Sequence, residues 1–496
     1  MYYTSTRDKN VRLSDAEAIL KGLSDDGGLL VPSEFPRFAT ADIELLRKMT
    51  YPQRAASVME LFLPDFTRDE LYGMAKAAYG ADKWDGGLAA PVRKLDGATY
   101  ALELWHGPTC AFKDIALQML PRLLSASLGK TGETRDVCIL VATSGDTGKA
   151  ALEGFRDVPR VKIAVFFPRD GVSDVQKLQM TTQEGGNVGV ASVGGNFDDA
   201  QSGVKRIFSD AAFRAELNAA GLTLSSANSI NWGRLLPQIA YYFSAYCDLV
   251  NAGELETGDP LDFVVPTGNF GNILAGYYAR KMGLPIWRLV CASNKNDVLT
   301  EFINTGRYNA KRGFYATSSP SMDILVSSNL ERLLFDLSGE DDALISGYMK
   351  SLAESGGYTV NDDLKGHISD LFTGIACDEA ETSAQIAELR SRFGYLADTH
   401  TAVGFGALKK LREADGAAAQ TVVVSTASPY KFCGSVIEAL GGQPRGDGFE
   451  LLGELESLTG TEAPRPLRGL LGKTARFGDC VAKDEMADWV KSFLGM

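Results

Sequence analysis

The stretch Val137-Cys-Ile-Leu-Val-Ala-Thr-Ser-Gly-Asp-Thr-Gly-Lys-Ala-Ala-Leu-Glu-Gly-Phe155 contains one complete strand, loop and helix. Its first six residues are apolar and do not alternate with polar ones, which is typical of a strand buried on both faces of a parallel sheet. Small and hydroxyl-bearing residues follow, and the last seven residues have helical spacing. This unit predicts an open α/β sheet whose ligands bind at the carboxyl ends of the strands.

The same alternation of strand and helix extends along the chain on either side of this unit. Further short apolar runs predict strands at 162–167, 262–266, 287–292 and 421–425, with helices such as 273–282 between them. We expect residues 1–95 to be a mainly helical N-terminal region and 96–496 to be a core of two α/β subdomains. The smaller would cover about 125–225, the larger 96–124 and 226–496, with a more helical insertion at about 296–395.

Composition and charge exclude several classes of protein. Apolar residues make up 45% and charged residues 23% of the 496, as in a soluble globular protein, and the formal net charge is −13. That charge argues against a nucleic-acid or anionic-membrane partner. We find no stretch long enough to span a membrane and no signal peptide. The seven cysteines are scattered without a C-x-x-C pair and the three histidines lack metal-ligand spacing, so we expect no metal and a reducing, cytoplasmic setting.

Lys113 lies in the loop Leu104-Trp-His-Gly-Pro-Thr-Cys-Ala-Phe-Lys-Asp-Ile-Ala-Leu117, where a turn at Gly107-Pro108 leads into a helix. Its neighbours are apolar, and burial would lower the pKa of a lysine and so favour the neutral amine that a Schiff base requires. The alternative is a surface lysine at a helix start, and this motif alone does not decide between the two.

Two other loops expose backbone N–H groups at the start of a helix, which is an anion-binding arrangement. The first is Thr143-Ser-Gly-Asp-Thr-Gly148, which lacks the Walker A spacing and could instead hold a plain N-cap. The second is Pro266-Thr-Gly-Asn-Phe-Gly-Asn272, which lacks the dinucleotide fingerprint and favours a cofactor with a single phosphate, unless it is simply a tight turn.

The last two polar loops are Val424-Ser-Thr-Ala-Ser-Pro-Tyr-Lys-Phe432 and Ala227-Asn-Ser-Ile-Asn-Trp-Gly-Arg234. Arg234 has the geometry to hold a phosphate or carboxylate through two hydrogen bonds, or it could lie on a helix surface. We interpret His400 as a structural histidine and Lys431 as a surface lysine, although either could approach a pocket.

In this order, the loops resemble those of the pyridoxal-phosphate enzymes of the tryptophan-synthase-β fold family (fold type II). Four places sharpen the resemblance to the longer bacterial and fungal branch of the threonine synthases. They are Tyr3-Thr-Ser-Thr-Arg7 with Asp26-Gly-Gly-Leu29, His106-Gly-Pro-Thr109 with Phe112-Lys-Asp114, Thr143-Ser-Gly-Asp-Thr-Gly148, and Asn228-Ser-Ile-Asn231. The resemblance covers nearly the whole chain.

The resemblance implies a role for each matching residue. Lys113 would bind pyridoxal phosphate as a Schiff base and move protons during turnover, and Thr426 would meet the pyridine nitrogen. The cofactor phosphate would lie against Gly268, Asn269, Phe270, Gly271 and Asn272. Ser144, Gly145, Asp146 and Thr147 would take the substrate carboxylate, and Asn228, Ser229 and Arg234 the substrate phosphate.

Asp146 departs from many relatives, which carry an asparagine that contacts the phenolic oxygen of the cofactor. An ionised carboxylate cannot donate a hydrogen bond there. Asp146 is therefore expected either to be protonated or to be oriented differently.

The reaction implied is the conversion of O-phospho-L-homoserine and water to L-threonine and phosphate, the last step of threonine biosynthesis, by a carbon–oxygen lyase. One alternative is a phospho-lyase or dehydratase that releases a keto acid, ammonia and phosphate. Another is a protein that carries the cofactor without catalysis. We expect a monomer or homodimer.

Overall fold

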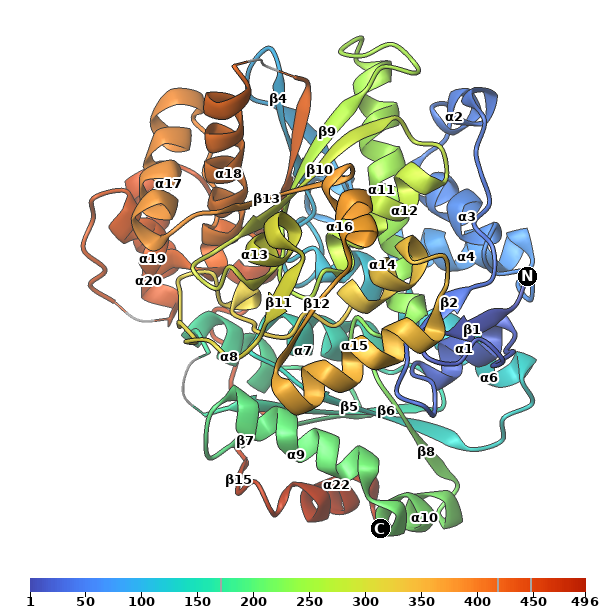
Figure 1. The fold of residues 1–496 in the computed structure, drawn as a ribbon. Helices are drawn as coiled ribbons and strands as arrows, with labels where there is room; N and C mark the ends of the chain where they lie inside the picture. Colours follow the sequence, from blue (N-terminus) through green and yellow to red (C-terminus); the bar gives the residue numbers. More distant parts are fainter. Residues whose placement is uncertain (170–171, 417–418, 447) are drawn as a thin grey trace.

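A six-stranded sheet forms the larger part of the fold in the computed structural model, which describes residues 1–169, 172–416, 419–446 and 448–496 (Figure 1). Its strands lie in the order β13 (Phe372–Ala376), β10 (Ile286–Ser293), β9 (Leu261–Pro266), β14 (Thr421–Ser425), β4 (Thr99–Glu103) and β3 (Val92–Lys94). All neighbouring strands are parallel except β3, which is antiparallel to β4. The carboxyl ends of β4, β9, β10 and β14 therefore meet at one edge.

A second, five-stranded sheet is entirely parallel and lies below the first in Figure 1. Its order is β15 (Cys480–Val481), β7 (Val188–Val193), β6 (Val161–Pro168), β5 (Asp136–Ala142) and β8 (Leu222–Ser225). One face of this sheet is covered by α9 (Phe197–Ser209), α10 (Ala211–Ala219) and α22 (Met486–Leu494).

The C-terminal segment therefore lies against the smaller sheet, whereas the sequence prediction placed it with the larger one. β15 pairs with β7, and Met486, Val490 and Leu494 of α22 are buried in the same apolar cluster as β5 and β6. Nothing near residue 480 in the sequence shows this, because a two-residue strand has no recognisable pattern.

The predicted fold class, α/β with open, largely parallel sheets, is confirmed, and the five predicted strands are β5, β6, β9, β10 and β14. β13 was not predicted, and it places part of the expected 296–395 insertion in the main sheet. The rest of that segment is α13 (Val298–Thr305), the antiparallel strand pair β11 (Arg307–Asn309) and β12 (Gly357–Thr359), α14 (Leu330–Leu337), α15 (Asp342–Ser355), α16 (Asp362–Ser369) and α17 (Glu379–Phe393).

The N-terminal region adds a two-stranded antiparallel sheet and four helices to one side of the larger sheet. The elements are β1 (Tyr3–Ser5), α1 (Asp15–Lys21), β2 (Leu30–Pro32), α2 (Thr40–Leu46), α3 (Tyr51–Glu60) and α4 (Arg68–Tyr79). Ser14 and Thr67 begin α1 and α4 with capping boxes. These helices pack on α11 (Trp232–Asn251), which is buried on all sides and shares one apolar core with them.

The remaining helices lie between successive strands along the chain. They are α5 (Lys113–Leu117), α6 (Leu120–Lys130), α7 (Asp146–Phe155), α8 (Asp174–Thr181), α12 (Gly271–Lys281), α18 (Thr399–Asp415), α19 (Cys433–Ala439), α20 (Gly448–Thr459) and α21 (Arg465–Arg468). α5, α7 and α12 each begin in one of the loops singled out in the sequence.

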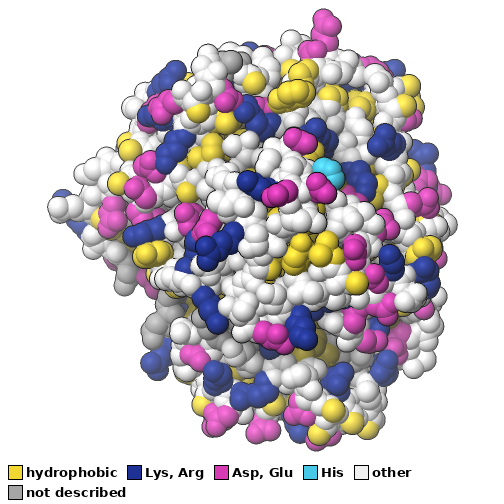
Figure 2. All heavy atoms as spheres, in the orientation of Figure 1, with side chains coloured by type: hydrophobic (Ala, Val, Ile, Leu, Met, Phe, Trp, Pro, Cys, Tyr) yellow, Lys and Arg dark blue, Asp and Glu magenta, His cyan; other side chains and the backbone are white. Residues whose placement is uncertain are grey.

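The surface carries both signs of charge. Figure 2 shows Lys and Arg side chains interspersed with Asp and Glu over the face drawn. Among the described residues, no helix is long and apolar enough to cross a membrane.

Candidate active site

Backbone pairing between two distant loops positions Lys113. The loop before α5 runs antiparallel to the segment after β14, with a bridge between Ala111 and Ala427. The Phe112 N–H donates to the Thr426 carbonyl oxygen at 2.8 Å. These contacts place the first residue of α5 beside the hydroxyl-rich end of β14, although more than three hundred residues separate the two in sequence.

Lys113 is buried rather than exposed, with 8% of its surface accessible. Its Nζ lies 3.3 Å from Asp146 Oδ2 and 3.2 Å from Ser321 Oγ. Burial lowers the pKa of this lysine; Asp146 raises it, and the charges of Lys431 and Arg234 lower it further. The net shift is downward, which favours the neutral amine that attacks a carbonyl group.

Asp146 lies between two lysines, and the surface position expected for Lys431 is wrong. Lys431 is 1% exposed, and its Nζ lies 2.6 Å from Asp146 Oδ1. Burial raises the pKa of Asp146, but the charges of Lys431 and Lys113 outweigh burial and hold it below the usual range. Of the two alternatives left open for Asp146, the structure favours an ionised carboxylate that faces these lysines.

Ser321 connects Lys113 to a buried histidine. The Ser321 N–H donates to Nε2 of His400 at 3.1 Å, and Nδ1 of His400 lies 2.9 Å from Asp398 Oδ1. Because Nε2 accepts, the ring proton lies on Nδ1 and points at Asp398. His400 is a structural histidine, as interpreted, and it holds the short 3₁₀ segment Pro320–Met322 against Lys113.

The loop from Gly268 to Asn272 has the properties of an anion cradle. Phe270 adopts a left-handed conformation (φ 63°) at the start of α12. Among the described residues, none accepts a hydrogen bond from the backbone N–H groups of 268–273. Asn272 Oδ1 accepts from the hydroxyls of Tyr241 and Tyr242, at 2.5 and 2.9 Å, and this fixes the side chain. Its Nδ2 is buried without a partner, which is costly unless a ligand accepts from it.

The walls of this cradle come from the segment that follows the 3₁₀ helix η2 (Pro320–Met322). Ser327 Oγ donates to the Gly268 carbonyl oxygen at 2.9 Å, and Asn329 Nδ2 donates to the Asn269 carbonyl oxygen at 3.0 Å. Asn329 Nδ2 also lies 3.1 Å from Ser229 Oγ. The cradle and the loop around Asn228 and Ser229 are thereby joined through one buried asparagine.

Arg234 is the second cationic group near Lys113. It lies in the first turn of α11, 5% exposed, and donates to the Ala227 carbonyl oxygen at 2.7 Å. It forms no ion pair with a carboxylate in the part of the chain that the structure describes, and burial lowers its pKa to about 10. A buried guanidinium without a carboxylate can bind an anionic ligand.

Other predicted residues offer unused donors. The Thr426 hydroxyl, and the side chains of Ser144 and Thr147, make no hydrogen bond to any residue that the structure describes. The Thr143 hydroxyl instead accepts from the N–H groups of Gly145 and Gly148, at 3.0 and 2.9 Å, and so fixes the loop.

Sequence reasoning missed four residues of this site, Gln176, Ser321, Asn329 and Arg332, and it placed Lys431 at the surface. Arg332 is fully buried and donates to the carbonyl oxygens of Leu30 and Ile230, which fixes the loop around Ser229 from behind. Gln176 Nε2 donates to Asp146 Oδ1 at 2.8 Å. The four missed residues lie outside the loops singled out in the sequence, so no local pattern identifies them.

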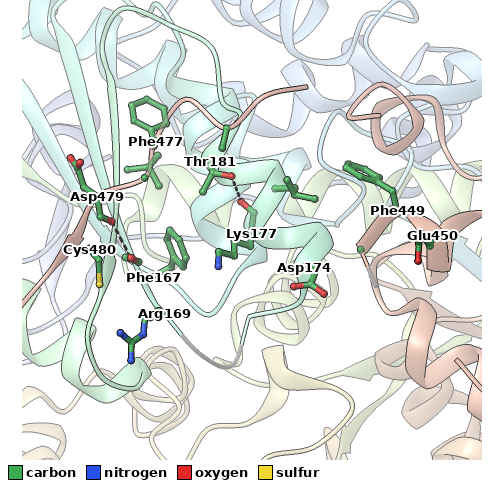
Figure 3. Close-up of a pocket in the computed structure, with 16 residues that line it drawn as sticks. Phe167, Arg169, Asp174, Lys177, Thr181, Phe449, Glu450, Phe477, Asp479 and Cys480 are labelled. Atoms are coloured by element: carbon green, nitrogen blue, oxygen red, sulfur yellow. Dashed lines mark hydrogen bonds between the residues drawn. The ribbon is translucent and has the colours of Figure 1, made fainter. Parts of the chain in front are cut away.

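A separate cavity of about 770 Å³ lies beyond α8, at the carboxyl ends of β6 and β7 (Figure 3). Its walls include Phe167, Lys177 and Phe477, and Lys177 lies between Phe167 and Asp174 in this view. The same helix directs Gln176 towards Asp146, so α8 separates this cavity from the site around Lys113.

Comparison with known proteins identifies the family. Residues 2–79 match the family model described as threonine synthase N terminus, residues 88–428 that of pyridoxal-phosphate dependent enzymes, and residues 401–492 that of threonine synthase, C-terminal. The chain is 42% identical over 447 residues to threonine synthase of Pseudomonas aeruginosa, covering 89% of this chain and 91% of that protein. It is 41% identical over 435 residues, 86% of its length, to human Threonine synthase-like 1, but spans only 58% of that protein.

A solved structure agrees. The crystal structure of PLP-bound threonine synthase from Brucella melitensis superposes with a TM-score of 0.88 at 38% sequence identity, covering 99% of both chains. The sequence matches and the structural match both extend over the two sheets and the N-terminal region. The chain therefore belongs to the threonine synthase family of pyridoxal-phosphate-dependent enzymes.

Proposed function

We propose that this protein converts O-phospho-L-homoserine and water to L-threonine and phosphate. The observation that carries the proposal is the presence of two separate anion-binding places around one buried lysine. One is the row of unused N–H groups at 268–273, and the other is Arg234. A cofactor phosphate and a substrate phosphate would require both.

The residues present fit pyridoxal phosphate. The orphaned Nδ2 of Asn272 and the free N–H groups of the same loop would donate to its phosphate. The free hydroxyl of Thr426 would contact the pyridine nitrogen, and Lys113 would form the Schiff base. When bound, the cofactor supplies an electron sink for negative charge that develops on the substrate carbons.

The remaining residues would hold the substrate. The N–H groups and hydroxyls of Ser144 to Thr147 would bind its carboxylate at the start of α7. Arg234, with Asn228 and Ser229, would bind its phosphate and orient it as a leaving group. Asn329 supports both phosphate positions, because it contacts the loop of each.

Lys113 would also move protons between substrate carbons. The downward shift of its pKa favours the neutral amine, which can accept a proton from a substrate carbon. Burial excludes bulk water from its Nζ, so that a proton taken at one carbon can be returned at another instead of being lost to solvent.

Product analysis tests this proposal. We expect purified protein loaded with pyridoxal phosphate to release phosphate and L-threonine in equal amounts from O-phospho-L-homoserine. The Lys113→Ala variant should release neither, at unchanged helix content by circular dichroism. Phosphate released together with ammonia and a keto acid would instead establish the phospho-lyase alternative, and no turnover would establish a non-catalytic carrier.

We further propose that the protein acts in the cytoplasm as a monomer or homodimer and binds no nucleic acid. The net charge of −13 supports the absence of nucleic acid, since a polyanion requires a positive surface. Light scattering on the purified protein would give its oligomeric state.

A further inference from the structure

The proposed function gives no role to Lys431. It ends the 3₁₀ helix η3 (Pro429–Lys431) directly after the β14 loop, and its side chain is completely buried. Its ammonium lies 2.6 Å from Asp146 Oδ1 and donates to the Thr109 carbonyl oxygen at 2.9 Å. Burying an ammonium is costly, and these contacts offset that cost only while Asp146 stays ionised.

Asp146 is thus shared by two lysines through different oxygens. Lys431 and Gln176 contact Oδ1, whereas Lys113 contacts Oδ2. Once Lys113 has formed its bond to the cofactor, it no longer has a free amino group to place beside Asp146. Without Lys431, the buried carboxylate would then keep the neutral amide of Gln176 as a partner but would lose the lysine that pairs with it directly.

We infer that Lys431 is a positioning residue for the reaction: its ammonium holds the Asp146 carboxylate beside Lys113 and balances its charge after Lys113 binds the cofactor. The inference rests on the proposed role of Lys113 as the cofactor lysine. It does not depend on which substrate the enzyme converts.

Several other charged or titratable groups surround this pair. Lys113 and Arg234 face it from α5 and α11, and His400, hydrogen-bonded to Asp398, faces it from α18. Asp114 and the Cys110 thiol lie on the Thr109 side. Burial raises the pKa of Asp114 to about 6 and that of the Cys110 thiol beyond the range of ordinary titration. Asp146 is thus the carboxylate that contacts both lysines directly.

Spectroscopic titration of the holoenzyme tests this inference without substrate. The absorbance of the bound cofactor is followed against pH. The midpoint of this titration reports deprotonation of the Schiff-base nitrogen that Lys113 contributes. In Lys431→Met the negative charge of Asp146 is no longer balanced, so the protonated form should persist and the midpoint should rise by about one pH unit. Lys431→Arg keeps the charge and should restore most of the wild-type midpoint.

Two further variants make the result specific. Lys149→Met removes another buried lysine, which lies one turn further along α7 and pairs with Glu153 at 3.4 Å instead of Asp146, and should leave the midpoint unchanged. Asp146→Asn should lower the midpoint, and the double variant Asp146→Asn, Lys431→Met should have a midpoint close to that of Asp146→Asn, because Lys431 acts through this carboxylate.

The outcomes separate the possibilities. An unchanged or lowered midpoint in a Lys431→Met protein that still binds cofactor would overturn the inference, as would an Arg variant that behaves like the Met variant. If Lys431→Met does not fold, a double variant whose midpoint lies about one unit above that of Asp146→Asn would overturn it, because Lys431 would then act without the carboxylate. Absence of any bound cofactor in the wild type would instead remove the proposed role of Lys113.

Discussion

Arg234 carries a positive charge in a buried position where no carboxylate of the described chain balances it. Burial alone accounts for the lowering of its pKa. A cation in this environment reduces the free energy of unfolding, because its desolvation is only partly offset by the bond to Ala227. We therefore expect Arg234 to serve a ligand and not the stability of the fold.

Replacement of Arg234 should therefore separate activity from stability. We expect Arg234→Met to reduce kcat/KM for O-phospho-L-homoserine by roughly 10- to 100-fold, since a charge-assisted contact is worth about 1.5–3 kcal/mol. In the absence of substrate, its free energy of unfolding in urea should be equal to or higher than that of the wild type. A variant that loses both activity and stability would show a structural role instead.

For single residues, the local sequence does not distinguish the roles of Lys113 and Lys431. Lys113 and Lys431 each stand among apolar and hydroxyl residues, and each is buried beside Asp146. Only the resemblance to a known family pointed to Lys113. Lys431 was assigned to the surface because nothing in its own neighbourhood shows that a carboxylate nearly three hundred residues earlier lies opposite it.

The start of α12 shows how one element builds part of the site. Gly268 permits the β9 loop to pass close to the segment containing Ser321, since a Cβ at this position would lie 2.7 Å from the Ser321 carbonyl oxygen. The loop then turns through the left-handed Phe270 into the helix, which leaves its first N–H groups free.

A methyl group at position 268 should weaken cofactor binding without unfolding the protein. Gly268→Ala would push the Ser321 segment away from Lys113 and should weaken cofactor binding roughly 10- to 100-fold, as measured by fluorescence titration. The matched control is Gly347→Ala within α15, where a Cβ would meet nothing within 4 Å. It should leave binding unchanged and raise the free energy of unfolding by about 0.5–1 kcal/mol. Equal effects of both variants would contradict this account of the loop.

Elements were predictable where the local pattern was strong. The buried parallel strands β5, β6, β9, β10 and β14 are continuous apolar runs, and each was found. β7 contains Gly189 and Ser192, and β13 begins at Phe372 and contains Gly374, so neither has such a run. Their pairing with β6 and β10 is decided by tertiary packing, which overrides the weak local preference.

The N-terminal and C-terminal segments pack against different sheets of the molecule. The N-terminal helices share a core with α11 behind the larger sheet, whereas β15 and α22 complete the smaller sheet. The site lies between the sheets and draws on residues from 113 to 431. Its geometry therefore depends on long-range packing that no single stretch of sequence encodes, although each glycine-rich loop was recognisable by itself.

The N-terminal region should make stability depend on pH. Burial, together with the neighbouring Asp65, raises the pKa of Asp15 to about 7. A carboxyl group whose pKa is higher in the folded state binds its proton more tightly there, so its contribution to stability is complete below about pH 4 and is lost as pH rises through about 7. The free energy of unfolding of the wild type minus that of Asp15→Asn should fall by about 1–3 kcal/mol across this window. Asp69→Asn, in the exposed first turn of α4, should show no such trend, and a flat difference for Asp15→Asn would refute the prediction.

The central claim is that Lys113 is the residue bonded to the cofactor, and reduction followed by peptide mapping tests it most directly. Borohydride treatment of the holoenzyme fixes the bond, and mass spectrometry of a digest then locates the added mass. Lys431 is the natural competitor, because both lysines contact the same carboxylate. We predict that the reduced cofactor will be found on the peptide containing Lys113 and that Lys431 will remain unmodified. Modification of Lys431, or of any other lysine in place of Lys113, would contradict the account.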